Sequence, residues 1–239
     1  MNVREKAMAA AAPISRGEMG QAFAGISSCS ISDVMDDLGI PGVLSAAVAP
    51  RNGCKRFVGE AYTVRWDLVR KTRDIMSRPT STWDEVKDFL VPNLKEAAGK
   101  VYVAGAGALV NGMALAGGMS LTYFQARGFE AVVLGGAIRD AEIVRGAGIP
   151  VYASALTPAD TQGCMKVASI GTSCWIDNLE VRTGDIVFGD ESGVVVIPRN
   201  RLSEVITAAT KIEEMEGRMM AELASGRDLF EMITQNGRI

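Results

Sequence analysis

The chain has 239 residues, of which 48% are hydrophobic and 22% are charged, and its net charge is −3. This length suits one domain-sized hydrophobic core, and this balance is typical of a globular protein rather than a disordered one. The densest basic stretch, Arg65 to Arg73, is interrupted by Asp67, which argues against a nucleic-acid partner. Because the chain contains no histidine, Ser-His-Asp catalysis, Cys-His catalysis and histidine-ligated zinc are excluded.

Two further features bear on the compartment of the protein. No apolar stretch approaches the roughly 20 residues that span a bilayer, and the start, Met1 to Ala12, lacks the pattern of a secretory signal. We therefore expect a cytoplasmic protein with no membrane partner. No two cysteines have the two-residue spacing of zinc or redox sites, so we expect free buried thiols at Cys29, Cys54, Cys164 and Cys174.

The N-terminal part is predicted to be helical before it becomes rich in strands. A segment rich in Ala and Met favours a helix that ends near Gly25. Ser30 or Ser32 is a candidate N-cap for a short helix over Asp33–Leu38, which Gly39 and Pro41 would stop. Extended segments are then expected over Gly42–Ala49 and Arg56–Arg65.

The middle of the chain has helical spacing of apolar residues over Asp84–Ala98, despite Pro92, followed by a short buried strand at Lys100–Ala104. From Gly105 to Gly118 there is no charged residue and much Gly and Ala. Such a stretch either packs backbone on backbone or wraps a ligand. The run from Lys100 into this stretch fails the dinucleotide-binding pattern, because Val110 stands where the third glycine is required.

The second half alternates strands and helices, which indicates parallel βαβ units. The helices of these units are expected at Leu121–Arg127 and Asp140–Ala147, and their strands at Ala131–Leu134 and Val151–Ala153. Further strands are expected at Trp175–Val181, Asp185–Gly189 and Gly193–Ile197, with a turn over Asp190–Gly193, before a long amphipathic helix at Arg201–Leu223.

The segment Ala131–Asp140 carries the strongest functional signal. A buried strand runs into a Gly135-Gly136 turn that delivers Arg139 and Asp140 to the start of a helix, where α/β proteins place ligands. The guanidinium suits a carboxylate, and the adjacent carboxylate is a hard oxygen ligand for Mg²⁺ or Mn²⁺. An alternative stays open on this pattern alone, in which Asp140 caps the helix and Arg139 pairs with a surface acid.

Four segments, in order, resemble one family. They are ISDVMDDLG (Ile31–Gly39), GEAYTV (Gly59–Val64), GGAIRDAEIVRGAGIPVYASALTPADT (Gly135–Thr161) and GDIVFGDESGVVVIP (Gly184–Pro198). The family is that of the regulator of ribonuclease E activity and of the 4-hydroxy-4-methyl-2-oxoglutarate / 4-carboxy-4-hydroxy-2-oxoadipate aldolases. The matches span most of the chain, which makes them far more specific than a single motif.

The resemblance implies an α/β fold with β/β/α layers of the swivelling-domain kind and with helices at both ends. It implies one domain over residues 1–239, with a core at about 28–200 and a helical tail at 201–239. It also implies homotrimers or homohexamers with active sites between subunits.

The resemblance further implies roles for individual residues. Arg139 would hold the carboxylate of a 2-oxo acid, and Asp140 would coordinate Mg²⁺ or Mn²⁺. The backbone amides around Gly118, Met119 and Ser120 would close on the same carboxylate. The metal would stabilise a pyruvate enolate, which is shared by retro-aldol cleavage and oxaloacetate decarboxylation.

The sequence departs from the aldolase pattern at two positions. Gly118 stands where the pattern has an Asp, and Gly135 stands where many members carry an acid. The charged C-terminal helix matches the aldolase branch, in which a Glu of the tail reaches the metal site of the neighbouring subunit. Glu213, Glu214 and Glu216 are the candidates for this role, and a solvated helix face is the alternative.

The leading hypothesis is a metal-dependent lyase that cleaves or decarboxylates a 2-oxo acid. A second hypothesis is a non-catalytic, protein-binding regulator of ribonuclease activity, which the absent acid at Gly118 would favour. A third is an enzyme of related enolate chemistry on another substrate, which would bind metal without aldol cleavage.

Overall fold

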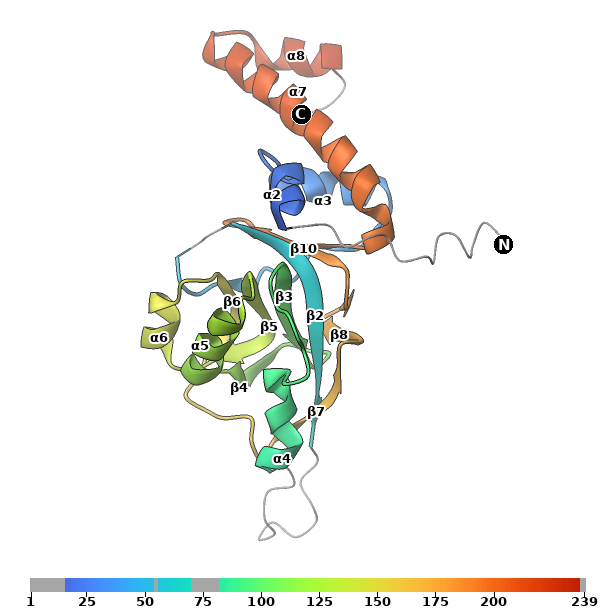
Figure 1. Cartoon of the computed structure of the whole chain (residues 1–239). Helices are drawn as coiled ribbons and strands as arrows, with labels where there is room; N and C mark the ends of the chain where they lie inside the picture. Colours follow the sequence, from blue (N-terminus) through green and yellow to red (C-terminus); the bar gives the residue numbers. More distant parts are fainter. Residues whose placement is uncertain (1–15, 54–55, 70–81, 237–239) are drawn as a thin grey trace, which may run out of the picture.

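The computed structural model has a curved, nearly closed sheet with helices packed outside it and at one end (Figure 1). It describes residues 16–53, 56–69 and 82–236. Within these residues the sheet order is β1-β6-β5-β3-β2-β10-β11, with β4 beside β5 and β7 beside β2. The strands of this sheet are β1 (Ala49–Pro50), β2 (Phe57–Leu68), β3 (Lys100–Gly105), β4 (Val110–Ala116), β5 (Ala131–Ile138), β6 (Val151–Leu156), β7 (Met165–Ile170), β10 (Ile186–Asp190) and β11 (Gly193–Ile197).

A separate hairpin and the helices complete the fold. The hairpin strands are β8 (Ser173–Ile176) and β9 (Leu179–Arg182). The helices are α2 (Arg16–Ala22), α3 (Ser28–Asp37), α4 (Trp83–Val86), α5 (Gly118–Arg127), α6 (Ala141–Gly146), α7 (Leu202–Ala224) and α8 (Leu229–Asn236), with 3-10 turns η1 (Lys87–Leu90) and η2 (Arg199–Arg201).

The strands at the centre of the sheet are buried on both faces. Successive side chains of a strand point to opposite sides, so each strand contributes to two different clusters of the core. In β3, Val101 and Val103 point into the concave side of the sheet, where they pack with Val133 of β5. Tyr102 and Ala104 point to the opposite face, under the helices. The strands β2, β3, β5 and β6 run parallel, as the alternation of strands and helices predicts.

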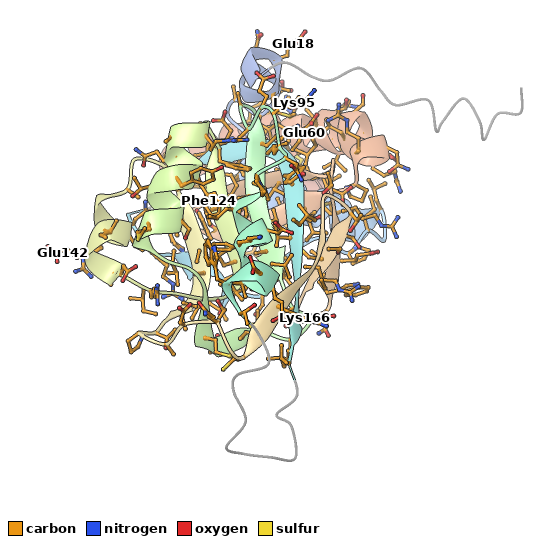
Figure 2. The ribbon with its side chains drawn as sticks, turned by 60° about the horizontal axis from the view of Figure 1, so that its bottom comes forward. Glu18, Glu60, Lys95, Phe124, Glu142 and Lys166 are labelled. Atoms are coloured by element: carbon orange, nitrogen blue, oxygen red, sulfur yellow. The ribbon has the colours of Figure 1, made fainter. Side chains whose placement is uncertain are left out.

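The outer helices cover one face of the sheet through aromatic contacts. The ring of Phe124 on α5 stacks on Tyr102 with centroids 4.1 Å apart, and Phe89 meets Phe124 edge-on. Figure 2 shows Phe124 in the interior, whereas Glu142 and Lys166 lie at the outer edge of the molecule. This packing fixes α5 and η1 relative to the carboxyl ends of β3 and β5.

At the other end of the sheet, α2, α3 and α7 pack on β10 and β11. The N-terminus of α3 is held by two acids from distant segments: Ser28 donates to Asp190 through its amide and hydroxyl, and Glu213 of α7 accepts from the Ser27 amide and the Ser30 hydroxyl. The helix α7 then extends away from the sheet, at the end opposite α4 (Figure 1).

The α/β prediction and the parallel βαβ units are confirmed, and several predicted boundaries are corrected. The helix predicted over Asp33–Leu38 begins at Ser28, and its N-cap is Ser27, whose hydroxyl accepts from the Ser30 amide. The strand predicted over Gly42–Ala49 is wrong, since only an isolated bridge at Val43 and the short β1 lie there. The early part of the predicted N-terminal helix lies outside the described residues.

Three other predictions fail for local reasons. The helix over Asp84–Ala98 ends near Val91, because Pro92 disfavours helical backbone at the preceding residue, which has φ 48°. The strand over Trp175–Val181 is a hairpin that turns at Asp177, where φ is 54°. The predicted Gly135-Gly136 turn is instead part of β5.

The cysteine prediction is correct for pairing and partly wrong for burial. Cys29, Cys164 and Cys174 are free thiols, but only Cys174 is buried, and burial raises its pKa to about 12. Cys54 lies outside the described residues, as do Met1 to Ala12 and residues 70–73 of the basic stretch. No helix in the described ranges has the length and apolarity needed to cross a membrane.

Candidate functional site

Arg139 and Asp140 lie just beyond β5, between the starts of α5 and α6. The amide of Arg139 donates to the carbonyl of Ala116, which holds the end of β5 beside the end of β4. Asp140 has φ 63° and ψ 54°, a left-handed conformation that Asp tolerates better than most residues. This backbone turns the chain sharply from the strand into α6.

The carboxylate of Asp140 serves a different helix from the one it precedes. It makes no side-chain cap of α6, and its Oδ2 accepts from the Gly118 amide at 2.7 Å, at the N-terminus of α5. A negative charge there is favoured by the helix dipole. Asp140 therefore does not cap the helix that the alternative assigned to it, and it caps α5 instead. The structure places Gly118 beside Asp140, while their roles toward a ligand stay predictions.

Arg139 lies between two carboxylates. Its Nη1 is 3.4 Å from Asp160 Oδ2, and its Nε is 3.8 Å from Asp140 Oδ2. All three side chains are between 40% and 52% exposed, so these ion pairs add little stability, and the guanidinium keeps donors for a ligand. Asp160 was missed as a site residue, although it lies within the resembling run that ends at Thr161.

The expected amide cluster at the start of α5 is present, and parts of it are already engaged. The hydroxyl of Ser120 accepts from the Gly117 amide at 2.8 Å and donates to the Gly117 carbonyl, so Ser120 closes the first turn of α5. Met119 is 88% exposed and lines the same pocket as Arg139. Gly117 is a further missed residue: a Cβ there would lie 2.9 Å from both Arg139 Cγ and Asp140 Oδ2.

At Gly118 and Gly135, the two positions that depart from the aldolase pattern, neighbouring side chains occupy the space where a larger residue would lie. A Cβ at Gly118 would lie 2.5 Å from Cδ1 of Ile143. The Ile143 side chain therefore occupies the space that an acidic side chain at position 118 would need. A Cβ at Gly135 would lie 2.9 Å from Cγ1 of Ile176, in the packed concave side of the sheet. Carboxylates at either position would require neighbouring side chains to move.

In the glycine-rich stretch Gly105–Gly118, the structure shows the packing of backbone on backbone, whereas ligand binding stays a prediction. At its start, a Cβ on Gly105 would lie 2.2 Å from the carbonyl oxygen of Trp175, so backbone packs on backbone. At its end, Gly117 and Gly118 lie against Arg139 and Asp140. Only the second part belongs to the candidate site.

A cavity of about 360 Å³ opens beside the Arg139 guanidinium. Its polar side holds Ser120, Arg139, Asp140, Asp160, Thr161 and Gln162. The cavity is also lined by apolar side chains, which we call the apolar wall: Trp83, Val86, Phe89, Leu90 and Leu115. The volume is in the range of small-molecule sites. The helical spacing over Asp84–Ala98 predicts the segment that carries Val86, Phe89 and Leu90, but it does not predict that these side chains line a cavity.

The three glutamates of α7 lie away from this cavity, at the opposite end of the molecule (Figure 1). Glu213 is engaged with Ser27 and Ser30 of its own chain. Although burial, the largest contribution, raises the pKa of Glu213, these hydrogen bonds and the charge of Arg56 leave it below its usual value. Glu214 is exposed and Glu216 is partly exposed.

The donor set limits how the site could hold a cation. Among the described residues, no three Asp, Glu or Cys side chains are grouped as a metal cage. Asp140 and Asp160 nevertheless flank Arg139 at the cavity. Mg²⁺ commonly binds through one or two carboxylates and keeps several waters, so the pair fits a hydrated ion and does not fit a fully protein-ligated one.

The parallel strands, the Arg-Asp turn at a strand end and the adjoining cavity define an α/β protein with a candidate small-molecule site. The comparisons with known proteins specify the family. Residues 28–196 match the RraA-like family, described as Aldolase/RraA, and the chain belongs to this family.

Individual relatives are distant. The chain is 28% identical to protein DlpA of Legionella pneumophila over 84% of its own length, but it spans only 31% of DlpA. It is 27% identical to a putative 4-hydroxy-4-methyl-2-oxoglutarate aldolase of Halalkalibacterium halodurans, over 79% of this chain and 80% of that protein. The fold is similar to that of RraAS2 of Streptomyces coelicolor, with a TM-score of 0.67, 24% identity and coverage of 87% and 100% of the two chains.

Proposed function

We propose that this protein is a divalent-metal-dependent lyase that acts on a 2-oxo acid through a pyruvate enolate, by retro-aldol cleavage or by oxaloacetate decarboxylation. The proposal rests mainly on one observation, which is that Arg139 lies between Asp140 and Asp160 in the lining of a cavity of about 360 Å³. The Arg139 guanidinium, which can bind the substrate carboxylate, thus lies next to two carboxylates that can serve as hard oxygen ligands for a metal.

The residues of this chain would position the substrate and exclude water. Arg139 would bind the carboxylate through paired N–H donors, and the start of α5 would add its positive dipole end. Asp160 would keep the guanidinium oriented through its contact with Nη1. The apolar wall would shield the reacting carbons, which strengthens the electrostatic contacts made in the cavity.

A bound Mg²⁺ or Mn²⁺ would supply Lewis-acid stabilisation of the enolate oxygen. Asp140 is the proposed protein ligand, with Asp160 beside it. Since these carboxylates are few, the remaining positions would be filled by water and by oxygens of the substrate. The proposal also covers the C-terminal tail: Glu214 and Glu216 would approach this site in a neighbouring subunit of a homotrimer or homohexamer, whereas Glu213 has partners in its own chain.

The test is pyruvate release by the purified full-length chain from oxaloacetate and from 4-hydroxy-2-oxo acids, with Mg²⁺, with Mn²⁺ and with a chelator. The proposal expects release that depends on the metal and that needs a higher substrate concentration in Arg139→Gln. Absence of metal-dependent release from every substrate would refute it.

A second function, binding to a ribonuclease as a non-catalytic regulator, is favoured by one observation. The aldolase pattern has an acid where this chain has Gly118, and Ile143 fills the adjoining space, so one carboxylate of that pattern is absent. A pull-down with ribonuclease E, paired with metal titration of wild type and Asp140→Ala, separates the two proposals. Ribonuclease binding without metal binding would favour the regulator, and metal binding alone would favour the lyase.

A further inference from the structure

The polar and apolar sides of the cavity together indicate the class of substrate. The cavity lining contains one cation, Arg139, and two acids, Asp140 and Asp160, among the described residues. With a divalent cation added, these groups of one chain carry a single net positive charge, which balances one carboxylate. Glu214 and Glu216 of a neighbouring subunit, which the proposed function brings to this site, would add only negative charge. A second carboxylate on the substrate would meet Asp160 or the apolar wall, where no described cation lines the cavity.

The apolar wall is a built surface rather than a loose loop. The ring of Phe89 packs against Trp66 and Phe124, with centroids 5.7 Å and 6.4 Å away, and its carbonyl accepts a hydrogen bond from Tyr102 at 3.1 Å. Val86 and Leu115 are only 3% and 1% exposed. The wall therefore offers a fixed apolar surface in the cavity that Arg139 also lines, suited to an apolar group.

Trp83 is the member of the wall best placed to set specificity. It begins α4 and is 52% exposed while lining the cavity, so its indole is available to a ligand and contributes little to the core. Aromatic side chains of this kind offer a large contact area for an aryl ring at low entropic cost.

We infer that the preferred substrate is a 4-hydroxy-2-oxo acid with one carboxylate and an apolar group, aryl or branched alkyl, on C4. This inference rests on the proposed lyase function. In the cleavage the C3–C4 bond breaks, and the 4-hydroxyl loses its proton as C4 becomes an aldehyde carbonyl. The bonding electron pair stays on C3 as the enolate, which takes a proton at C3 to give pyruvate, and no other reactant is needed.

The experiment has a binding arm and a cleavage arm, both with the full-length protein and Mg²⁺. Binding is measured by calorimetry with 4-phenyl-2-oxobutanoate and with 2-oxoadipate, neither of which has the 4-hydroxyl needed for cleavage. Cleavage is measured as pyruvate release from 4-hydroxy-4-phenyl-2-oxobutanoate and from 4-hydroxy-2-oxoglutarate. The inference expects the aryl mono-acid to be favoured about tenfold or more in both arms, because the di-acid leaves a carboxylate unpaired.

Three variants sharpen the result. Trp83→Arg places a cation in the wall and should reduce or reverse the preference, whereas Trp83→Phe should keep it. Trp175→Arg is the matched control, since Trp175 is 45% exposed on β8 and does not line the cavity. Equal or tighter binding of 2-oxoadipate by the wild-type protein would overturn the inference. Release of pyruvate from no substrate, with the aryl ligand still preferred, would instead refute the lyase function.

Discussion

The carboxylate of Asp140 accepts a hydrogen bond from the backbone amide of Gly118 at 2.7 Å. This contact joins the end of β5 to the start of α5 and fixes the left-handed backbone of Asp140. The same side chain therefore has a structural role, as a cap of α5, and a proposed chemical role, as a metal ligand. Variants of Asp140 can separate the two roles.

Asp140→Asn should preserve stability, and Asp140→Ala should not. Asn keeps an acceptor oxygen for the Gly118 amide and tolerates φ 63°, whereas Ala loses the cap and strains the backbone. We expect Ala to lower the unfolding free energy by about 1–2 kcal/mol and Asn by less than about half of that. Urea unfolding followed by circular dichroism measures both, and equal losses would show that the cap contributes nothing.

Arg139→Gln should reduce the affinity for a 2-oxo acid by about 30-fold or more, since it removes a charge-assisted, two-point contact. The effect should be seen as a raised KM for oxaloacetate and as weaker binding of pyruvate. Arg145→Gln is the control, because Arg145 is exposed in the last turn of α6 and lines no part of the cavity. A similar loss in both variants would contradict the assigned role.

Gly118→Asp should destabilise the protein by about 1–2 kcal/mol, because its side chain meets Ile143 and the Cβ of Asp140. Gly118→Asp combined with Ile143→Ala should recover most of this loss. Gly112→Asp is the matched control, since a Cβ there meets no atom within 4 Å. If the double variant is as unstable as Gly118→Asp, the steric explanation is wrong.

Glu213→Gln should lower stability at neutral pH and have little effect in acid. The pKa of Glu213 is lowered on folding, so its contribution is present above the ordinary value of 4.5 and is lost as pH falls through the lowered pKa. We expect a difference of about 1 kcal/mol at pH 7, after allowance for solvent screening. Thermal unfolding across pH 3 to 7, with exposed Glu214→Gln as control, measures it, and a difference that persists at pH 3 would contradict the linkage.

Some of the site could be predicted from sequence because its signals are local. The run before Arg139 is continuously apolar and the next residues form a helix, so a strand end carrying Arg139 and Asp140 follows from chain order alone. The extent of β5 could not be read in this way. Gly135 and Gly136 normally suggest a turn, but here they let the strand pass close to Ile176 and Leu115.

Other parts of the site depend on contacts between distant segments. Asp160 lies in a loop with no periodic pattern, and only the folded chain brings it to Arg139. Four residues of the apolar wall, Trp83, Val86, Phe89 and Leu90, belong to the short α4–η1 segment that ends before Val91 and Pro92, and Leu115 joins them from β4. The contact between Glu213 and α3 joins residues far apart in the chain and has no local signal.

The most direct test of the central claim is metal-dependent release of pyruvate from oxaloacetate by the wild-type protein and by Asp140→Asn, which retains the α5 cap. The lyase proposal expects release with Mg²⁺ or Mn²⁺ that a chelator removes, and at least about a 100-fold lower rate in Asp140→Asn at unchanged stability. Equal, metal-independent rates in the two proteins would contradict it.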